Sequence, residues 1–197
     1  MKKTILLFLS VLFCVSLSAK KMHLPLEIIA GKADLIVMGR IIDIQEKTYT
    51  FKITETMKGS SGINITVEKF REWTCDIRFA KHKVGQELFL FLQKSEGNWM
   101  IIDGGNGEIP IINQQIKLMN PTVYTAANPN PTYSLTTFKN GIRLFCQYFQ
   151  LIQKGENVYR SSFSFKTLVS NDKVVSFKLA SPFSSWLAMQ MKKYDQM

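Results

Sequence analysis

The sequence is poor in the residues that most often build metal sites, disulfide frameworks and catalytic centres. Its 197 residues include two histidines and three cysteines, and neither histidine stands at a spacing typical of metal ligands. A Gly-x-Ser-x-Gly motif, which marks many serine hydrolases, does not occur. The fifteen acidic residues are scattered, so no carboxylate pair stands out for acid–base chemistry. We therefore predict a protein that is not an enzyme and holds no cofactor; an enzyme built from residues dispersed in the sequence is the alternative.

The surroundings of His82 argue against a metal site there. His82 lies between Lys81 and Lys83, and neighbouring positive charge opposes the binding of a cation. We interpret His82 as an exposed histidine of a loop, and we predict no metal ligand in the chain.

One glycine-rich segment, residues 104–107, invites comparison with phosphate-binding loops. Such loops lead from a strand into a helix, whose N-terminus faces the phosphate. Here Glu108–Ile111 follows, which has the character of a strand. We therefore interpret residues 104–107 as a hairpin turn.

The first nineteen residues have the layout of a secretory signal peptide. Two lysines precede an apolar run over residues 5–17, and the small residues Ser18 and Ala19 follow. The run is shorter than the roughly 20 apolar residues of a membrane anchor, and no later run approaches that length. A lipid anchor on Cys14 would follow the bulky Phe13, so a lipid or uncleaved anchor is the weaker alternative. We expect cleavage after Ala19 and a periplasmic or extracellular protein without an integral membrane segment.

Cleavage after Ala19 would change the charge and the cysteine count. Two lysines leave with the leader, which lowers the net charge from +10 to +8. Two cysteines remain, Cys75 and Cys146. In an oxidising compartment they could form one disulfide, or they could be two buried free thiols.

Residues 33–112 carry the patterns of about six strands with short connections. Apolar and polar residues alternate over residues 49–54, which is typical of a half-buried strand. The run 88–92 is apolar throughout and predicts a central strand covered on both faces. Gly39 interrupts a further strand, as a bulge or barrel bend would. The pattern predicts a small antiparallel OB-like barrel over residues 20–119.

The period of the apolar residues changes beyond a Pro- and Asn-rich connection, residues 120–132. Apolar residues spaced by three and four from Leu135 to Ile152 predict an amphipathic helix, with Ser134 as its N-cap. We expect residues 133–197 to form a helical extension packed on the barrel, so the fold class is mainly β with C-terminal helices.

A second helix is expected to begin at Ser181-Pro182, because proline is favoured at the first position of a helix. The segment before it, Ser162 to Leu179, fits either a hairpin or extended chain followed by a short helix. Its residues Val174, Val175 and Phe177 favour a strand.

Four segments share the rhythm of a known module. They read Ala-Asp-Leu-Ile-Val-Met-Gly-Arg, Tyr-Thr-Phe-Lys-Ile-Thr-Glu-Thr-Met-Lys-Gly, Ile-Asn-Ile-Thr-Val and Val-Gly-Gln-Glu-Leu-Phe-Leu-Phe-Leu. With these segments, residues 33–112 resemble the OB-fold barrel of netrin-like modules, which include the tissue inhibitors of metalloproteinases, in the version found in exported bacterial proteins. The resemblance implies the fold. In those inhibitors an N-terminal cysteine binds the target's zinc, whereas Lys20 would begin this chain.

Basic and aromatic residues gather in the segment after residue 70. The candidate contact residues for a partner or a polyanion are Arg71, Trp73, Arg78, Lys81 and Lys83. OB-folds often bind single-stranded nucleic acid through aromatic residues on a basic groove, but export argues against that partner. A solvated basic surface without a specific ligand would show the same charge.

We predict an exported, non-enzymatic binding or protein-interaction module whose partner is a protein or an acidic polymer. A protease-inhibitor-like domain and a polyanion-binding OB-fold are the alternatives.

Overall fold

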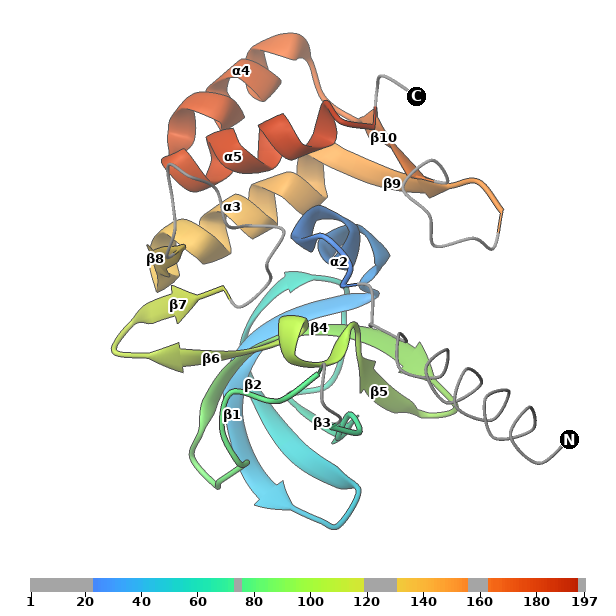
Figure 1. Cartoon of the computed structure of the whole chain (residues 1–197), viewed down its shortest axis with the longest axis vertical. Coiled ribbons are helices and arrows are strands. Elements are labelled where there is room, and N and C mark those ends of the chain that lie inside the picture. The colour runs from blue at the N-terminus through green and yellow to red at the C-terminus, as the bar shows by residue number, and fades with distance from the viewer. Residues whose placement is uncertain (1–22, 73–75, 119–130, 156–162, 195–197) are drawn as a thin grey trace, which may run out of the picture.

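The computed structural model describes residues 23–72, 76–118, 131–155 and 163–194. A β-barrel forms one end of the molecule and a group of helices the other, with the short helix α2 (Leu26–Lys32) between them (Figure 1). The chain is therefore mainly β with C-terminal helices, as the sequence predicts.

Five strands close the barrel. They are β1 (Leu35–Ile44), β2 (Thr48–Lys58), β3 (Asn64–Glu68), β4 (Glu87–Ser95) and β5 (Asn98–Ile101). Their order is β1-β2-β3-β5-β4, and β4 pairs again with β1. The β3–β5 pair is parallel and the other pairs are antiparallel. An odd number of strands cannot alternate in direction around a ring, so the OB-like barrel is mixed rather than wholly antiparallel.

Gly39 allows the sharp curvature of β1. The pairing of β1 with β2 shifts in register between Met38 and Gly39. A Cβ atom at Gly39 would lie 2.1 Å from the carbonyl oxygen of Lys52 on β2. The predicted bend is confirmed, and its cause is the close approach of two backbones.

Strand β4 is covered on both faces, as its unbroken apolar run predicts. Leu88, Leu90 and Leu92 face the barrel interior and belong to its core. Phe89 and Phe91 face the other way, into a second core shared with the helices. Because these two faces are buried in different cores, β4 joins the barrel to the rest of the molecule.

Three further strands extend the sheet beyond β4. They are β6 (Glu108–Ile112), β7 (Gln115–Lys117) and β8 (Thr132–Ser134). The turn before β6 contains the 3₁₀ helix η1 (Gly104–Asn106). Both β5 and β6 pair with β4 and not with each other, so the predicted hairpin turn at residues 104–107 is wrong.

Three helices follow, α3 (Leu135–Tyr148), α4 (Asn171–Ala180) and α5 (Pro182–Met191). The Ser134 hydroxyl caps α3 by accepting a hydrogen bond from the backbone N–H of Thr137, at 3.1 Å. Ser181 caps α5 in the same way, and proline occupies the first turn. Within the described ranges, no helix has both the length and the apolar character needed to cross a membrane.

The first long helix ends earlier than its apolar pattern predicts. It stops at Tyr148, and the chain continues as β9 (Phe149–Gln153), which pairs with β10 (Phe163–Thr167). Phe149 is buried in the shared core. Its position in the sequence would therefore suit the apolar face of a longer helix as well as the strand that it forms. Ile152, the last residue of the predicted stripe, is largely exposed, while its neighbour Leu151 packs inward.

Residues 163–180 form extended chain followed by a helix, the second of the two predicted arrangements. The preference of Val174 and Val175 for a strand is wrong, because both lie in α4. Phe177 from the same helix is fully buried in the shared core, and this packing outweighs the local propensity of the valines.

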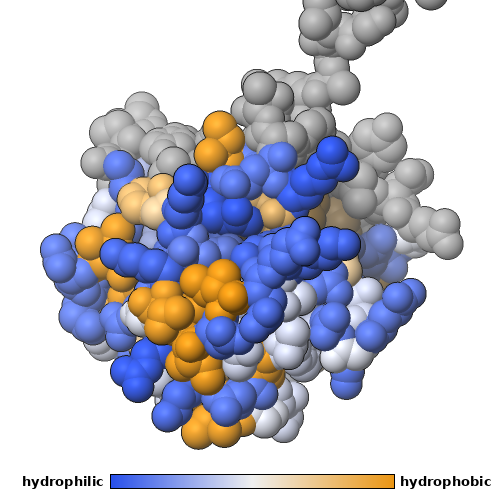
Figure 2. Space-filling view, turned by 90° about the horizontal axis from the view of Figure 1, so that it is seen from below, coloured by the Kyte–Doolittle hydropathy of each residue, from blue (hydrophilic) through white to orange (hydrophobic). Residues whose placement is uncertain are grey.

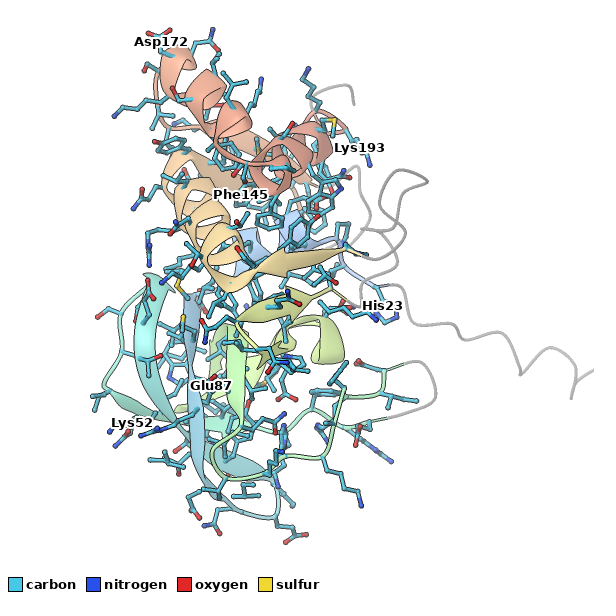
Figure 3. All side chains as sticks on the ribbon, turned by 90° about the vertical axis from the view of Figure 1, so that its left-hand side faces the viewer. His23, Lys52, Glu87, Phe145, Asp172 and Lys193 are labelled. Atoms are coloured by element: carbon cyan, nitrogen blue, oxygen red, sulfur yellow. The ribbon has the colours of Figure 1, made fainter. Side chains whose placement is uncertain are left out.

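Aromatic rings form the layer between the barrel and the helices. The ring of Phe138 on α3 lies 4.9 Å from that of Phe89 on β4 and 4.9 Å from that of Phe183 on α5. Phe145, also on α3, points into the same layer (Figure 3). The two halves of the molecule therefore share one continuous core.

Candidate binding surface and the polar network beneath it

Between β3 and β4, the side chains of residues 76–79 point alternately inward and outward, and the side chain of His82 points inward again. Asp76, Arg78 and His82 make hydrogen bonds or ion pairs with buried groups of the fold. The residues between them, including Ile77 and Phe79, are exposed. The segment thus turns three polar side chains inward and its large apolar side chains outward.

Glu108, at the start of β6, is the centre of the inward-facing network. Its Oε2 accepts a hydrogen bond from the Tyr49 hydroxyl on β2, at 3.0 Å. Its Oε1 lies 2.9 Å from Nε2 of His82, and the side chains of both residues are only 4% exposed. The His82 ring also packs edge-on against the Tyr49 ring, with 4.7 Å between the centroids. The prediction of an exposed His82 is therefore wrong.

The reason lies in the direction of neighbouring side chains. In extended chain, successive side chains point to opposite sides. Lys81 and Lys83 are exposed, while His82 between them points inward to the carboxylate of Glu108. The two neighbouring lysines therefore do not determine the surroundings of the His82 ring.

The Arg78 guanidinium contacts other groups of the protein and is largely shielded from solvent. Its guanidinium donates to Glu72 Oε2, at 2.8 Å, and to the carbonyl oxygen of Phe70, at 2.9 Å. Its Nε lies 3.5 Å from Glu108 Oε1, and its guanidinium covers the Phe70 ring at 4.5 Å. These contacts fix the loop, so the Arg78 guanidinium is not available to bind a ligand at the surface.

The network changes the acidity of Tyr49. Burial raises the pKa of its phenol well above the usual value, because the phenolate would lose its hydration, and the nearby carboxylate of Glu108 adds to the rise. Tyr49 is therefore a hydrogen-bond donor throughout the neutral range.

A second network fixes the glycine-rich turn. The backbone N–H of Gly105 donates to Asp76 Oδ1, at 2.9 Å. Asp103 Oδ2 accepts from the backbone N–H of Leu24, at 3.0 Å, and from Nδ2 of Asn106, at 2.7 Å. A Cβ at Gly104 would lie 2.0 Å from Asp76 Oδ2. A carboxylate thus stands against the turn, where a phosphate would be repelled.

The described residues contain no group of three or more histidine, cysteine, aspartate or glutamate side chains placed to hold a metal ion.

An open groove lies on the outside of the barrel, beside this loop. Its three walls are Arg40–Ile42 of β1, residues 79–80 and 83–87 of the loop and β4, and Ile111–Asn113 at the end of β6; its volume is about 650 Å³. We call it the strand-end groove. Four of its apolar side chains are exposed: Ile42 (37%), Phe79 (46%), Val84 (64%) and Ile112 (48%). Seen from the barrel end, apolar side chains gather in a group framed by hydrophilic ones (Figure 2).

Positive charge accompanies these apolar side chains. Arg40 and Lys83 line the groove, and Lys81 stands beside Lys83 in the chain. No ion pair joins these three cations to any other residue of the described parts. Glu87 is the acidic residue among those that line the groove.

The sequence-predicted contact residues therefore separate into three groups. Arg71, Lys81 and Lys83 are exposed and available. Arg78 belongs to the network below the surface. Trp73 lies outside the described residues.

The predicted disulfide partners cannot be compared, since Cys75 lies outside the described residues. Cys146, on α3, has a free thiol packed against the shared core. Burial raises the pKa of this thiol to about 11, and nearby Lys58 acts in the opposite direction. The thiol is thus protonated and unreactive at neutral pH.

Sequence reasoning missed the groove and the network of Tyr49, His82 and Glu108. Their one local signal is the alternation of polar and apolar residues over residues 76–79. The partners on β2 and β6 are distant in the chain and carry no motif.

Compared with known proteins, the chain matches no model of a protein family and no curated protein.

Proposed function

We propose that the protein is an exported, non-catalytic binding module that contacts a partner protein through the strand-end groove and the outward face of its loop. The observation that carries this proposal is the inverted burial of residues 76–84. There the fold buries Asp76 and the side chain of His82, which faces the buried Glu108 of β6, while Phe79 and Val84 face solvent.

This inversion has a cost that a purely structural loop would avoid. Apolar surface left in water forgoes about 25 cal/mol for each Å² that burial would have removed. Burying polar groups requires that each be matched by hydrogen bonds, as the contacts of Glu108 show. Contiguous exposed apolar surface on a soluble protein commonly marks an interaction site.

Export is part of the proposal and rests on the leader. The positive start, the short apolar run and the small residues before Lys20 support it. The absence of a catalytic role rests on the network, because Tyr49, His82 and Glu108 are buried and turned toward one another rather than toward the groove.

Site-specific photo-crosslinking in the producing cells tests the binding role. A benzophenone amino acid at Val84 should yield a discrete cross-linked adduct, whereas the same group at Leu179, exposed on α4, should not. Equal adduct patterns at the two positions, or none at Val84, would contradict the proposal.

A polyanion-binding OB-fold is the second candidate, favoured by the exposed cations Lys81 and Lys83, which form no ion pair with the described residues. Replacing both with glutamate should lower the salt concentration that elutes the protein from immobilised heparin. Replacing Lys173 and Lys178 on α4 is the matched control. Elution of both variants at the same salt would exclude a specific polyanion site on this loop.

The netrin-like assignment also belongs to the proposal. The closed strand order β1-β2-β3-β5-β4 supports it at the level of an OB-like barrel. The start of the described chain is bound to the protein itself, since Leu24 donates to Asp103 and His23 contacts Asn106. That arrangement favours the binding role over a protease-inhibitor-like domain that acts through its N-terminal segment.

A further inference from the structure

We infer that the strand-end groove binds an extended, acidic peptide segment with large apolar side chains, supplied by a partner protein. The inference rests on the proposed function and specifies the chemistry of the partner at the same surface.

The pairing of three strands creates the groove. Strands β1 and β6 flank β4 on opposite edges: Arg40 pairs with Glu87, and Leu88 pairs with Pro110. Both flanking strands run past the point where β4 begins, β1 to Ile44 and β6 to Ile112. Neighbouring strands lie about 4.8 Å apart, so the gap between the flanking strands is about one strand wide.

The loop fills the first part of this gap, because residues 85–86 continue the pairing of β4 with β1. The backbone N–H of Ile41 donates to the carbonyl oxygen of Gln86, at 3.0 Å, and that of Gly85 donates to the carbonyl oxygen of Ile41, at 2.8 Å. Beyond this pair the groove opens to solvent, between Ile42, Val84 and Ile112. An extended segment fits this space better than a helix, whose diameter with side chains is about 10–12 Å.

The apolar walls determine which side chains the segment should carry. Every second side chain of an extended peptide points to the same side. Large apolar residues on that side would cover Ile42, Phe79 and Val84, and each fully buried apolar side chain contributes about 1.5–3 kcal/mol. The shape matters as well: the apolar side chains line a hollow, which suits a peptide rather than a flat lipid surface.

The charges around the groove determine the sign of the charge that a partner should carry. Arg40 and Lys83 line the groove without an ion pair to the described residues, and Glu87 is the acidic lining residue. The chain as a whole has a formal net charge of +10. A second copy of this chain would be repelled, whereas acidic side chains would be attracted.

Fluorescence anisotropy with defined peptides tests this inference on the protein expressed from its full sequence. The probe is a labelled octapeptide of alternating glutamate and leucine. Two control peptides replace either every glutamate with lysine or every leucine with serine. We expect saturable binding of the first peptide and at least about tenfold weaker binding of each control.

Two variants place the peptide in the groove. Val84→Glu should oppose both the apolar and the charge contact, and Lys83→Glu the charge contact alone; each should weaken binding by about tenfold or more. The matched controls are Leu179→Glu and Lys173→Glu on α4, at the opposite end of the molecule from Glu87, where Asp172 is seen in Figure 3. Both groove residues are exposed, so the thermal midpoint should stay unchanged in all four variants.

The outcomes separate the inference from the function on which it rests. Loss of peptide binding in the groove variants alone supports the inference. If the peptide does not bind but the benzophenone amino acid at Val84 still yields a discrete cross-linked adduct, the peptide inference is wrong and the contact with a partner protein stands. If the peptide does not bind and the benzophenone amino acid at Val84 yields no discrete adduct, both are wrong.

Discussion

Tyr49 shows how one buried side chain holds two distant parts of the chain together. Tyr49 lies on β2, its hydroxyl donates a hydrogen bond to Glu108 of β6, and its ring packs against His82 of the loop before β4. Buried networks of this kind are stable only when each member keeps its partner.

Replacing Tyr49 with phenylalanine should destabilise the protein at neutral pH and make its stability less sensitive to alkaline pH. At pH 7 the free energy of unfolding should fall by about 1–2 kcal/mol, because a buried oxygen of Glu108 loses its donor. The pKa of Tyr49 is raised in the folded state, so its contribution is fully present below the unfolded pKa of about 10 and is lost as pH rises toward the folded pKa. The variant should therefore lose less stability than the unmodified protein above pH 10.

Denaturant unfolding between pH 7 and pH 11 measures both effects. Tyr148→Phe, on α3, is the matched control. A Tyr49→Phe variant whose pH profile runs parallel to that of the unmodified protein would contradict the assignment.

Gly39 is constrained by the backbone of the neighbouring strand. A Cβ would lie 2.1 Å from the Lys52 carbonyl oxygen, and carbonyl groups in a barrel ladder have little room to retreat. Gly39→Ala should lower the free energy of unfolding by about 2 kcal/mol or more. Gly62→Ala, whose Cβ would meet nothing closer than 3.7 Å, should change the free energy of unfolding much less. Equal losses in the two variants would show that the Lys52 carbonyl oxygen does not constrain Gly39.

At the scale of elements, an ion-pair cluster joins α3 to the barrel. Glu55 of β2 accepts from Lys139 Nζ, at 2.8 Å, and also from the Arg143 guanidinium, both on α3. The hydrogen bond from Lys139 is the main reason that the pKa of Glu55 is lowered. The cluster is partly exposed, so water and salt weaken it.

Glu55→Gln should make the docking of α3 less sensitive to acid. A lowered carboxyl pKa contributes stability above the unfolded pKa of about 4.3, and this contribution is lost as pH falls through the folded pKa. The variant should be less stable than the unmodified protein by up to about 1 kcal/mol at pH 7, and the difference should vanish near pH 3. Urea unfolding across this range provides the measurement, with Glu46→Gln as the exposed control; a difference independent of pH would argue against the ion pairs.

The spacing of apolar residues along the sequence predicted most strands and helices, because each type of element has its own characteristic spacing. The apolar faces of β1, β2 and β4 and the caps at Ser134 and Ser181 follow from neighbouring residues alone. Phe149 fits both a helical stripe and a strand, and the choice depends on pairing with β10, which lies beyond the reach of a local pattern. The burial of His82 depends in the same way on Glu108, twenty-six positions along the chain.

At the scale of the whole molecule, the two faces of β4 make the barrel dependent on the helices. Phe89 and Phe91 belong to the core that α3 and α5 cover, together with Ile36 from β1. Exposing three such side chains would cost about 1.5–3 kcal/mol each. The total approaches the 5–15 kcal/mol by which a typical domain is stable.

A chain that ends after Leu118 should therefore fail to fold as a cooperative monomer, although it retains all five barrel strands. The full chain should unfold in a single transition, because one aromatic layer spans both halves. Hydrogen exchange compares the two: barrel amides protected in the full chain should exchange rapidly in the fragment. Strong protection in an isolated, monomeric fragment would show that the barrel is a separate folding unit, and the helices would then be an attachment to the binding module rather than half of its core.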